Sequence, residues 1–181
     1  MEQVILVDTQ DNEMGTMEKM KAHELGLLHR AFSIFIFNTK GELLLQQRAF
    51  DKYHSGGLWT NTCCSHPRPQ ENIAAAAHRR LQEEMGFDTD INHAFSFIYK
   101  VGLDHGLTEH EYDHVFTGIF ENEIVPNKDE IASYCYKNIE TISLEMEAQP
   151  HQFTEWFKIV FHQVVKVHLD STKISTISPS E

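Results

Sequence analysis

Runs of apolar residues separated by short polar stretches predict several strands in the first part of the chain. Phe32–Phe37 is a β-branched and aromatic run, and Leu43–Gln47 is a second apolar run. The polar residues between them, Asn38–Gly41, indicate a hairpin turn. Because Phe32–Phe37 is apolar on both faces, we expect this strand to be central and covered on both sides. Val4–Asp8 predicts a further short strand.

A helical pattern follows in the middle of the chain. Apolar residues recur at every fourth position over Glu71–Met85, and four consecutive alanines favour the helical state. Gly86 stands where a C-terminal cap belongs. Strands and helices mixed in this way predict an α/β or α+β sandwich. The remaining predicted elements are the strands Phe95–Val101, Tyr112–Phe120 and Ser133–Tyr136 and an amphipathic helix from Thr154 to about Val167.

The length of the chain limits this sandwich to one domain. Its 181 residues, 41% of them hydrophobic, suffice for a single core, because domains usually contain about 100–200 residues. We expect the domain to cover residues 1–169 and the Ser- and Thr-rich tail, residues 170–181, to be disordered. No stretch approaches the roughly 18–20 apolar residues of a membrane helix, and the N-terminus lacks the features of a signal peptide. A cytoplasmic protein without a membrane partner is therefore expected.

Charge and residue usage narrow the possible ligands. The net charge of −12 argues against a general nucleic-acid surface, which would need a basic stripe to displace counterions. A few Lys and Arg side chains that converge locally would still accommodate a small anion. The three cysteines, Cys63, Cys64 and Cys135, are an odd number with two adjacent, which predicts reduced thiols. Twelve histidines favour a metal site without locating it.

The segment Trp59–Pro67 concentrates reactive side chains. In an extended chain Cys64 and His66, two positions apart, point to the same side. A thiol beside a metal-binding imidazole would have its thiolate form favoured. The alternative is that Cys63 and Cys64 are small buried residues and that His66 lies in a loop. A zinc ribbon is disfavoured because the sequence has no second cysteine pair at the required spacing.

A pair of glutamates suggests a cation site. Glu109 and Glu111 lie at the entry to a predicted strand, so both face one side while His110 faces the other. Carboxylates this close repel unless a proton or a cation lies between them, although a solvated acidic turn is the simpler explanation from these residues alone. Two upstream histidines flank a loop that leads into the first long strand. A combined set of three nitrogens and two carboxylates would suit Mn²⁺, Zn²⁺ or Mg²⁺, and it consists of His23, His29, His66, Glu109 and Glu111.

A second pattern spans the predicted helix. Ser65, five residues, Glu71, seven residues and then the run Arg79–Phe87 follow the order and spacing of the Nudix box. Two positions depart from it, because Ser65 replaces the leading glycine and Arg80 replaces the glutamate after the first arginine. In Nudix hydrolases the glutamates of this helix hold Mg²⁺ against a diphosphate so that water can attack phosphorus.

Arg80 changes the chemistry expected of this helix. It shares one helical ridge with Glu83 and Glu84, where it removes an acidic ligand and supplies a phosphate clamp. The site should hold a diphosphate and cut it poorly. The alternative is an exposed, salt-bridged helix face.

These features together resemble the type I isopentenyl-diphosphate isomerases, which are members of the Nudix superfamily. The resemblance extends from about Val4 to Val167, nearly the whole chain. It implies a Nudix-like α/β/α sandwich with a mixed central sheet. It also implies an enzyme that interconverts isopentenyl and dimethylallyl diphosphate by moving a double bond through proton transfer. The shared motifs are Gly26–Ser33, Leu43–Arg48, Thr60–Pro67, Glu109–Glu111 and Trp156–Lys158.

The resemblance also implies roles for individual residues. Cys64 and Glu111 match the opposed proton-transfer pair, which a Tyr99 proton would assist. Glu84 matches a ligand of the Mg²⁺ that accompanies the diphosphate. The matched ligands of a second, tightly bound Mn²⁺, Zn²⁺ or Mg²⁺ are His23, His29, His66, Glu109 and Glu111. The matched diphosphate clamp consists of Lys19, Arg48, Lys52 and Arg80.

Tyr99 and Trp156 match an aromatic pair at the hydrocarbon end of the substrate, although helical spacing alone makes Trp156 a core anchor. The loop His54–Leu58 differs from the family, so a differently shaped pocket mouth is expected. A small-molecule diphosphate is the expected partner of a monomer or weak homodimer. Two other functions stay open. The first is a Nudix pyrophosphohydrolase, which Arg80 disfavours. The second is a non-catalytic metal-binding homologue, which the complete set of site residues disfavours.

Overall fold

The computed structural model describes residues 2–175. The strands are β1 (Gln3–Val7), β2 (Glu13–Glu18), β3 (His29–Phe37), β4 (Leu43–Arg48), β5 (Trp59–Thr60), β6 (Cys63–Ser65), β7 (Ile91–Gly102), β8 (Thr108–Ile119) and β9 (Ile131–Lys137). The helices are α1 (Lys19–Leu25), α2 (Ile73–Met85), α3 (Ile139–Ala148) and α4 (Glu155–Ser175). Two short 3₁₀ turns, η1 (Asp104–Gly106) and η2 (Pro150–Gln152), lie in the connections.

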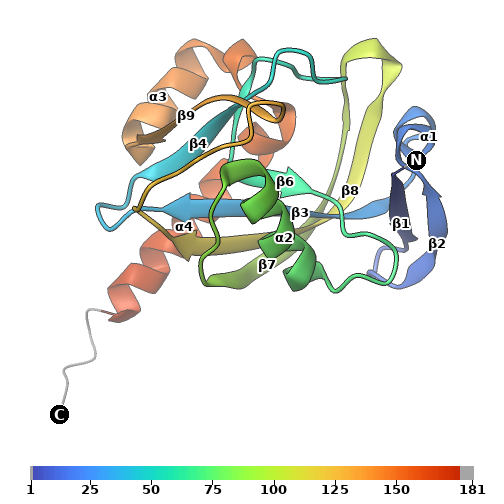
Figure 1. Ribbon diagram of the computed structural model, residues 1–181, viewed down its shortest axis with the longest axis horizontal. Coiled ribbons are helices and arrows are strands. Elements are labelled where there is room, and N and C mark those ends of the chain that lie inside the picture. The colour runs from blue at the N-terminus through green and yellow to red at the C-terminus, as the bar shows by residue number, and fades with distance from the viewer. Residues whose placement is uncertain (1, 176–181) are drawn as a thin grey trace.

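Strand β3 is the centre of a mixed sheet. Among the described residues nine strands form one sheet, in which β3 pairs antiparallel with β1, β4 and β6 and parallel with β8. Phe35 and Phe37 pack on one face of β3 with α3 and α4, whereas Ile34 and Ile36 pack on the other face with α2 (Figure 1). These layers confirm both the predicted α/β/α sandwich with a mixed sheet and the predicted central strand that is covered on both sides.

The sequence pattern did not predict several of these elements, namely β2, α1, β5, β6 and α3. Helix α1 is seven residues long and is stabilised at its ends, because the Glu18 carboxylate accepts two amide hydrogen bonds and Gly26 closes it with a φ of 59°. His23 lies on this helix and His29 is the first residue of β3. The two histidines flank a short connection, as expected, but regular structure holds each of them in place.

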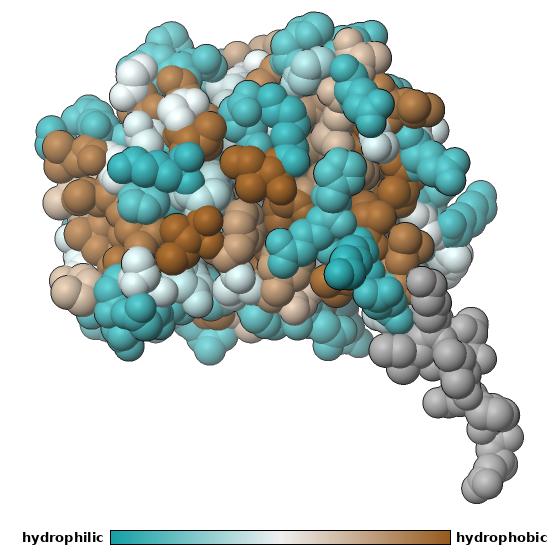
Figure 2. Space-filling model, turned by 180° about the vertical axis from the view of Figure 1, so that it is seen from behind, coloured by the Kyte–Doolittle hydropathy of each residue, from teal (hydrophilic) through white to brown (hydrophobic). Residues whose placement is uncertain are grey.

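The last helix is longer than predicted. Helix α4 continues to Ser175, so residues 170–175 of the expected disordered tail are helical. The His168 ring stacks on Phe37 with centroids 3.7 Å apart, which anchors this part of α4 to the core. Residues 176–181 of the tail lie outside the described residues. No helix in the described part of the chain is long and apolar enough to cross a membrane, and the rear face mixes apolar and hydrophilic side chains (Figure 2).

Helix α2 begins two residues later than predicted, at Ile73, because the Asn72 side chain caps it by accepting two amide hydrogen bonds. It ends at Gly86, as expected, and the packing there shows why the Nudix box requires a glycine. The φ of Gly86 is 76°, in the left-handed region, and an added Cβ atom would lie 2.0 Å from the carbonyl oxygen of Val125. A side chain at this position would therefore strain the backbone and also collide with it.

Gly86→Ala is expected to lower the free energy of unfolding by about 2–5 kcal/mol, through left-handed backbone strain and overpacking. Gly102→Ala is the matched control, because a Cβ atom at Gly102 would meet nothing within 4 Å. Denaturant titration of both variants measures the difference. Equal losses of stability would contradict the explanation.

Candidate active site

Strand pairing brings the predicted site residues onto one face of the sheet. His29 in β3 lies opposite Glu111 in β8, and Glu111 lies opposite Tyr99 in β7. In the same sheet Ser33 of β3 lies opposite Cys64 of β6. Residues opposite one another on neighbouring strands share a face, and so do residues two apart along one strand. All five side chains therefore extend from the face that α4 covers.

A cavity of about 330 Å³ opens on this face. The predicted site residues that line it are Lys19, Arg48, Lys52, Cys64, His66, Arg80, Glu84, Tyr99, Glu109, Glu111 and Trp156. The two others, His23 and His29, are fully buried beside it in ring contact with His66. The fold thus gathers every predicted site residue into one region.

Three imidazoles and a carboxylate converge next to the cavity. His66 Nε2 lies 2.9 Å from Glu111 Oε1 and 3.2 Å from His29 Nε2, and His29 Nε2 lies 3.5 Å from the same carboxylate oxygen. With His23, the four possible ligand atoms lie within 4.8 Å of one another. A second group with the same separation consists of His23, His54 and Glu109.

The imidazoles are oriented as metal ligands usually are. His23 Nδ1 lies 2.8 Å from the carbonyl oxygen of Lys19, and His29 Nδ1 lies 2.8 Å from that of Leu27. Each ring is thereby held with Nε2 towards the cluster, the outer-shell arrangement that orients metal-binding histidines. His23 Nε2 is buried and has no hydrogen-bond partner among the described residues. A divalent cation fits this donor set, because it would satisfy that nitrogen and separate the crowded ligand atoms.

Burial keeps the imidazoles in the form that binds a metal. It lowers the pKa of His54 to about 3 and that of His66 to about 4, the latter despite the Glu111 carboxylate. Burial also lowers the pKa of His23. Neutral imidazole has a free lone pair at pH 7, so these rings can bind a cation without first losing a proton.

The two glutamates are buried inside β8, at 5% and 7% exposure, so the alternative of a solvated acidic turn is wrong. Burial and the charge of Glu111 raise the pKa of Glu109 well above its usual value. Burial would raise that of Glu111 too, but hydrogen bonds with His29 and His66 hold its pKa well below its usual value. The Tyr99 hydroxyl oxygen lies 3.0 Å from Glu109 and 2.6 Å from Glu111, so its single proton is best placed to be donated to Glu111.

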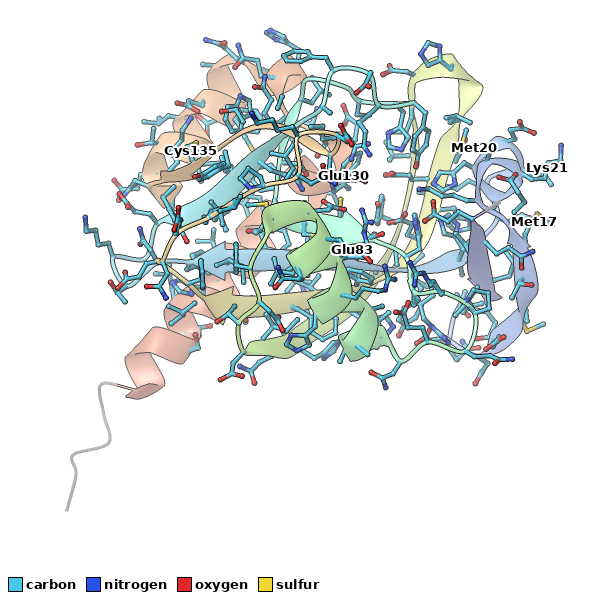
Figure 3. The ribbon with its side chains drawn as sticks, viewed as in Figure 1. Met17, Met20, Lys21, Glu83, Glu130 and Cys135 are labelled. Atoms are coloured by element: carbon cyan, nitrogen blue, oxygen red, sulfur yellow. The ribbon has the colours of Figure 1, made fainter. Side chains whose placement is uncertain are left out.

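The two adjacent cysteines face opposite sides of the sheet. Cys64 lines the cavity, whereas Cys63 is fully buried in the core under α2. Burial, together with nearby carboxylates, raises the pKa of the Cys64 thiol. The expected bias towards thiolate depends on a metal-bound imidazole beside it and stays a prediction. All three cysteines are free thiols, as predicted, and Cys135 lies on β9 (Figure 3).

Four cationic side chains line the cavity, and most of them have acidic partners. Lys19 Nζ lies 3.1 Å from Glu2 Oε2, and Lys52 pairs with Glu130. Arg48 has no carboxylate at ion-pair distance among the described residues, and its Nη2 donates to the carbonyl of His54 at 3.2 Å. The Nε atom of Arg48 is buried without a partner in the described part of the chain. Such an orphaned donor beside a cavity is suited to a bound anion.

Arg80 lies among three carboxylates. It contacts Glu83 at 2.9 Å, pairs with Glu84 and lies 3.5 Å from Glu130 (Glu83 and Glu130 are labelled in Figure 3). Its Nε atom is also buried without a partner among residues 2–175. Glu84 is 5% exposed and accepts a hydrogen bond from Gln46 at 3.2 Å. A diphosphate beside these acids would need a cation between them, which fits Mg²⁺ at Glu84.

Trp156 belongs to the core and to the cavity at once. It is 2% exposed and packs in the cluster under α4, as its helical spacing predicted, while it also lines the cavity. The guanidinium of Arg48 lies 5.4 Å from the centre of its ring. The two alternatives for Trp156 are therefore compatible.

Comparison with known proteins decides the family. The NUDIX domain model matches residues 27–157, most of the chain. The isopentenyl-diphosphate Delta-isomerase of Pectobacterium atrosepticum is 50% identical over 162 residues, which cover 90% of this chain and 90% of that protein. The protein of the same name from Burkholderia multivorans is 49% identical over 156 residues, covering 86% and 89% of the two chains. The chain belongs to the isopentenyl-diphosphate Delta-isomerase family.

Membership of this isomerase family confirms the predicted enzyme class and favours isomerisation over the Nudix pyrophosphohydrolase alternative. Solved structures agree in fold. One from Deinococcus radiodurans has a TM-score of 0.72 at 15% identity and covers 88% of this chain and 97% of its own. A MutT protein from Methanosarcina mazei has a TM-score of 0.62 at 19% identity, with 75% and 91% covered. At these identities the likeness concerns the Nudix fold alone.

Several residues around this isomerase-family cavity were missed. They are Glu2, Ser33, Gln46, Tyr53, His54 and Glu130. His54 was expected only to shape the pocket mouth, yet it is 4% exposed and belongs to the second group of possible ligand residues. Its loop has no periodicity, so the surplus of histidines was the one available signal. Glu130 precedes β9 and carries no local motif, which left nothing to indicate it.

Proposed function

We propose that this protein interconverts isopentenyl and dimethylallyl diphosphate, with Cys64 and Glu111 as the proton-transfer pair. The observation that carries the proposal is that these two side chains line one cavity together with the four cationic residues of the predicted clamp. A substrate whose diphosphate lies against those cations would have its short hydrocarbon chain within the same cavity.

The reaction moves a double bond by one carbon. One proton is added to the terminal alkene carbon and another leaves the allylic carbon, so atoms and charge balance over the cycle. An unactivated alkene is a poor base, and its protonation creates a tertiary carbocation-like species. The site must therefore supply an acid and a base and must keep water away from the cation. A cavity lined by both a thiol and a carboxylate, those of Cys64 and Glu111, supports this assignment.

The diphosphate end would be bound by the cationic residues, with one Mg²⁺ held through Glu84. Arg48 supports this assignment most directly, because its buried Nε donor lacks a hydrogen-bond partner among the described residues and a phosphate oxygen would supply one. Lys19, Lys52 and Arg80 would exchange part of their present carboxylate contacts for contacts with the substrate.

A second divalent cation, Mn²⁺, Zn²⁺ or Mg²⁺, would be held by His23, His29, His66, Glu109 and Glu111. Bound there, it would neutralise the carboxylates and help to set the proton affinity of Glu111. Tyr99 holds Glu111 in place through its 2.6 Å hydrogen bond. The faces of Tyr99 and Trp156 would stabilise positive charge on the hydrocarbon.

The test is incubation of isopentenyl diphosphate with the protein and Mg²⁺ in D₂O, followed by NMR. We expect dimethylallyl diphosphate to form with deuterium incorporated into it. A nucleotide-diphosphate panel with a phosphate-release assay is the parallel measurement. Rapid phosphate release without isomerisation would contradict the proposal and favour a hydrolase.

Arg80→Gln is expected to raise KM for the diphosphate by about 10–100-fold, since it removes a charge-assisted contact worth about 1.5–3 kcal/mol. Arg79→Gln is the matched control, because the neighbouring guanidinium pairs with Glu71 at 2.6 Å and does not line the cavity. Steady-state kinetics on both variants measure the effect. An unchanged KM in Arg80→Gln would remove this residue from the clamp.

Two further properties belong to the proposal. The protein is expected to act in the cytoplasm and to be a monomer or a weak homodimer that binds neither nucleic acid nor membrane. Light scattering over a concentration series measures the oligomeric state. A measured mass that corresponds to a tetramer or a larger assembly at every concentration would contradict the expected monomer or weak homodimer.

A further inference from the structure

We infer that His54 is a fourth imidazole ligand of the divalent cation at the His/Glu cluster. The inference rests on the metal centre of the proposed function and extends its set of ligands. With His54 included, the centre would have four nitrogen and two carboxylate donors, from His23, His29, His54, His66, Glu109 and Glu111.

His54 lies close to this cluster although it comes from the loop between β4 and β5. Its side chain is 4% exposed, and its Nε2 atom lies 3.7 Å from Glu109 Oε1. Its Nδ1 atom lies 3.2 Å from the Ser55 hydroxyl, which leaves Nε2 as the nitrogen on the cluster side. Its ring lies over that of His23 with centroids 6.3 Å apart.

The two groups of possible ligand atoms share one residue. Both contain His23, and its Nδ1 atom is already engaged by the Lys19 carbonyl at 2.8 Å, so one nitrogen remains. A neutral imidazole nitrogen donates its lone pair to a single metal ion, so an ion bound through His23 would be shared by both groups. Bond lengths of about 2.1 Å place opposite ligands about 4.2 Å apart. The ligand atoms lie up to 4.8 Å apart within each group, so binding of one ion would draw both groups inwards around His23.

The loop is anchored so that His54 is held towards the cluster. The backbone carbonyl of His54 accepts a hydrogen bond from Arg48 at 3.2 Å, and the next amide, of Ser55, donates to Asp104 at 3.3 Å. The Trp156 ring meets the His54 ring at an angle of 88°, with centroids 5.8 Å apart. A ligand that is held in this way loses little conformational entropy when it binds the ion.

A fourth imidazole changes which ion the centre prefers. Imidazole suits Zn²⁺, Ni²⁺ and Fe²⁺, whereas carboxylate and water suit Mg²⁺ and Mn²⁺. We therefore expect His54 to strengthen binding of Ni²⁺ and Co²⁺ more than binding of Mn²⁺. It would also occupy a coordination position that water would otherwise take.

The test uses metal-free protein loaded with Co²⁺, which shifts the NMR signals of exchangeable protons on its imidazole ligands. We expect four shifted N–H signals in the unaltered protein and three in His54→Ala. In competition titrations His54→Ala should lose about tenfold or more in Ni²⁺ affinity and less in Mn²⁺ affinity. His151→Ala, an exposed histidine on η2, is the matched control and should keep all four signals.

The outcomes separate this inference from the proposed function. Loss of a signal in His66→Ala but not in His54→Ala would overturn the role of His54 and leave the five-ligand centre standing. Unchanged signals in both variants would overturn the metal centre itself. If His54→Ala does not fold, His54→Gln keeps most of the side-chain volume and removes the imidazole. Four signals in that variant would equally exclude His54 as a ligand.

Discussion

Isomerisation by a Cys64→Ala variant is expected to fall by about 10²–10⁴-fold, the contribution of a well-placed general acid or base. The thiol lies on the cavity wall, and alanine removes its proton without introducing bulk. NMR in D₂O should show the loss of both dimethylallyl diphosphate formation and deuterium incorporation. Metal content should stay unchanged, because Cys64 belongs to neither group of possible metal ligands.

Cys63→Ala is the matched control for this experiment. Cys63 is fully buried on the opposite face of the sheet, in the core that α2 covers. Loss of its sulfur is expected to cost about 1 kcal/mol of stability and to leave most of the activity. An active Cys64→Ala beside an inactive, folded Cys63→Ala would show that the wrong thiol has been assigned.

Glu111→Gln is expected to reduce isomerisation at least as strongly as Cys64→Ala, because one carboxylate would serve both as proton carrier and as metal ligand. The amide keeps the shape of the side chain but can neither accept a proton in the same way nor carry the negative charge. Unlike the cysteine variant, this one should also bind metal more weakly, by about 100-fold or more. Elemental analysis after dialysis against a chelator measures the second effect.

His110→Ala is the control for the glutamate variant. His110 lies between Glu109 and Glu111 in β8 but faces away from the site, where its Nδ1 atom lies 3.0 Å from the Gly26 carbonyl. Its replacement should leave metal content and isomerisation nearly unchanged. Full metal retention in Glu111→Gln would show that this carboxylate is not a ligand, and full activity would exclude it from the proton transfer.

The sequence predicts those helices and strands in which the spacing of apolar residues reflects which side chains are buried. The run Phe32–Phe37 is apolar on both faces because β3 has a helical layer on each side. Helix α2 has apolar residues at every fourth position because one side of the helix packs on the sheet. Helix α3 was missed because it buries only Ile142 and Met146. Two buried residues do not make a recognisable apolar repeat in the sequence. Helix α1 was missed because its seven residues are held mainly by caps.

Much of the site chemistry also follows from local sequence. The Nudix spacing placed Arg80 and Glu84 on one helical ridge, and the alternation of an extended chain placed Cys64 and His66 on one side, where both line the cavity. These inferences succeed because helix and strand geometry relate residues that are only a few positions apart. The same local rule placed Glu109 and Glu111 on one side of their strand.

The convergence of these side chains in one site has a different physical origin. His23 comes from α1, His54 from a loop and Glu109 from β8, yet their possible ligand atoms lie within 4.8 Å of one another. Parallel pairing of β3 with β8 places His29 opposite Glu111 in the same way. That pairing arises from many weak contacts distributed over the sheet and its two cores, so no short segment records it. Local sequence therefore supplied the reactive groups and their orientation, whereas long-range packing set which of them meet and on which face the cavity opens.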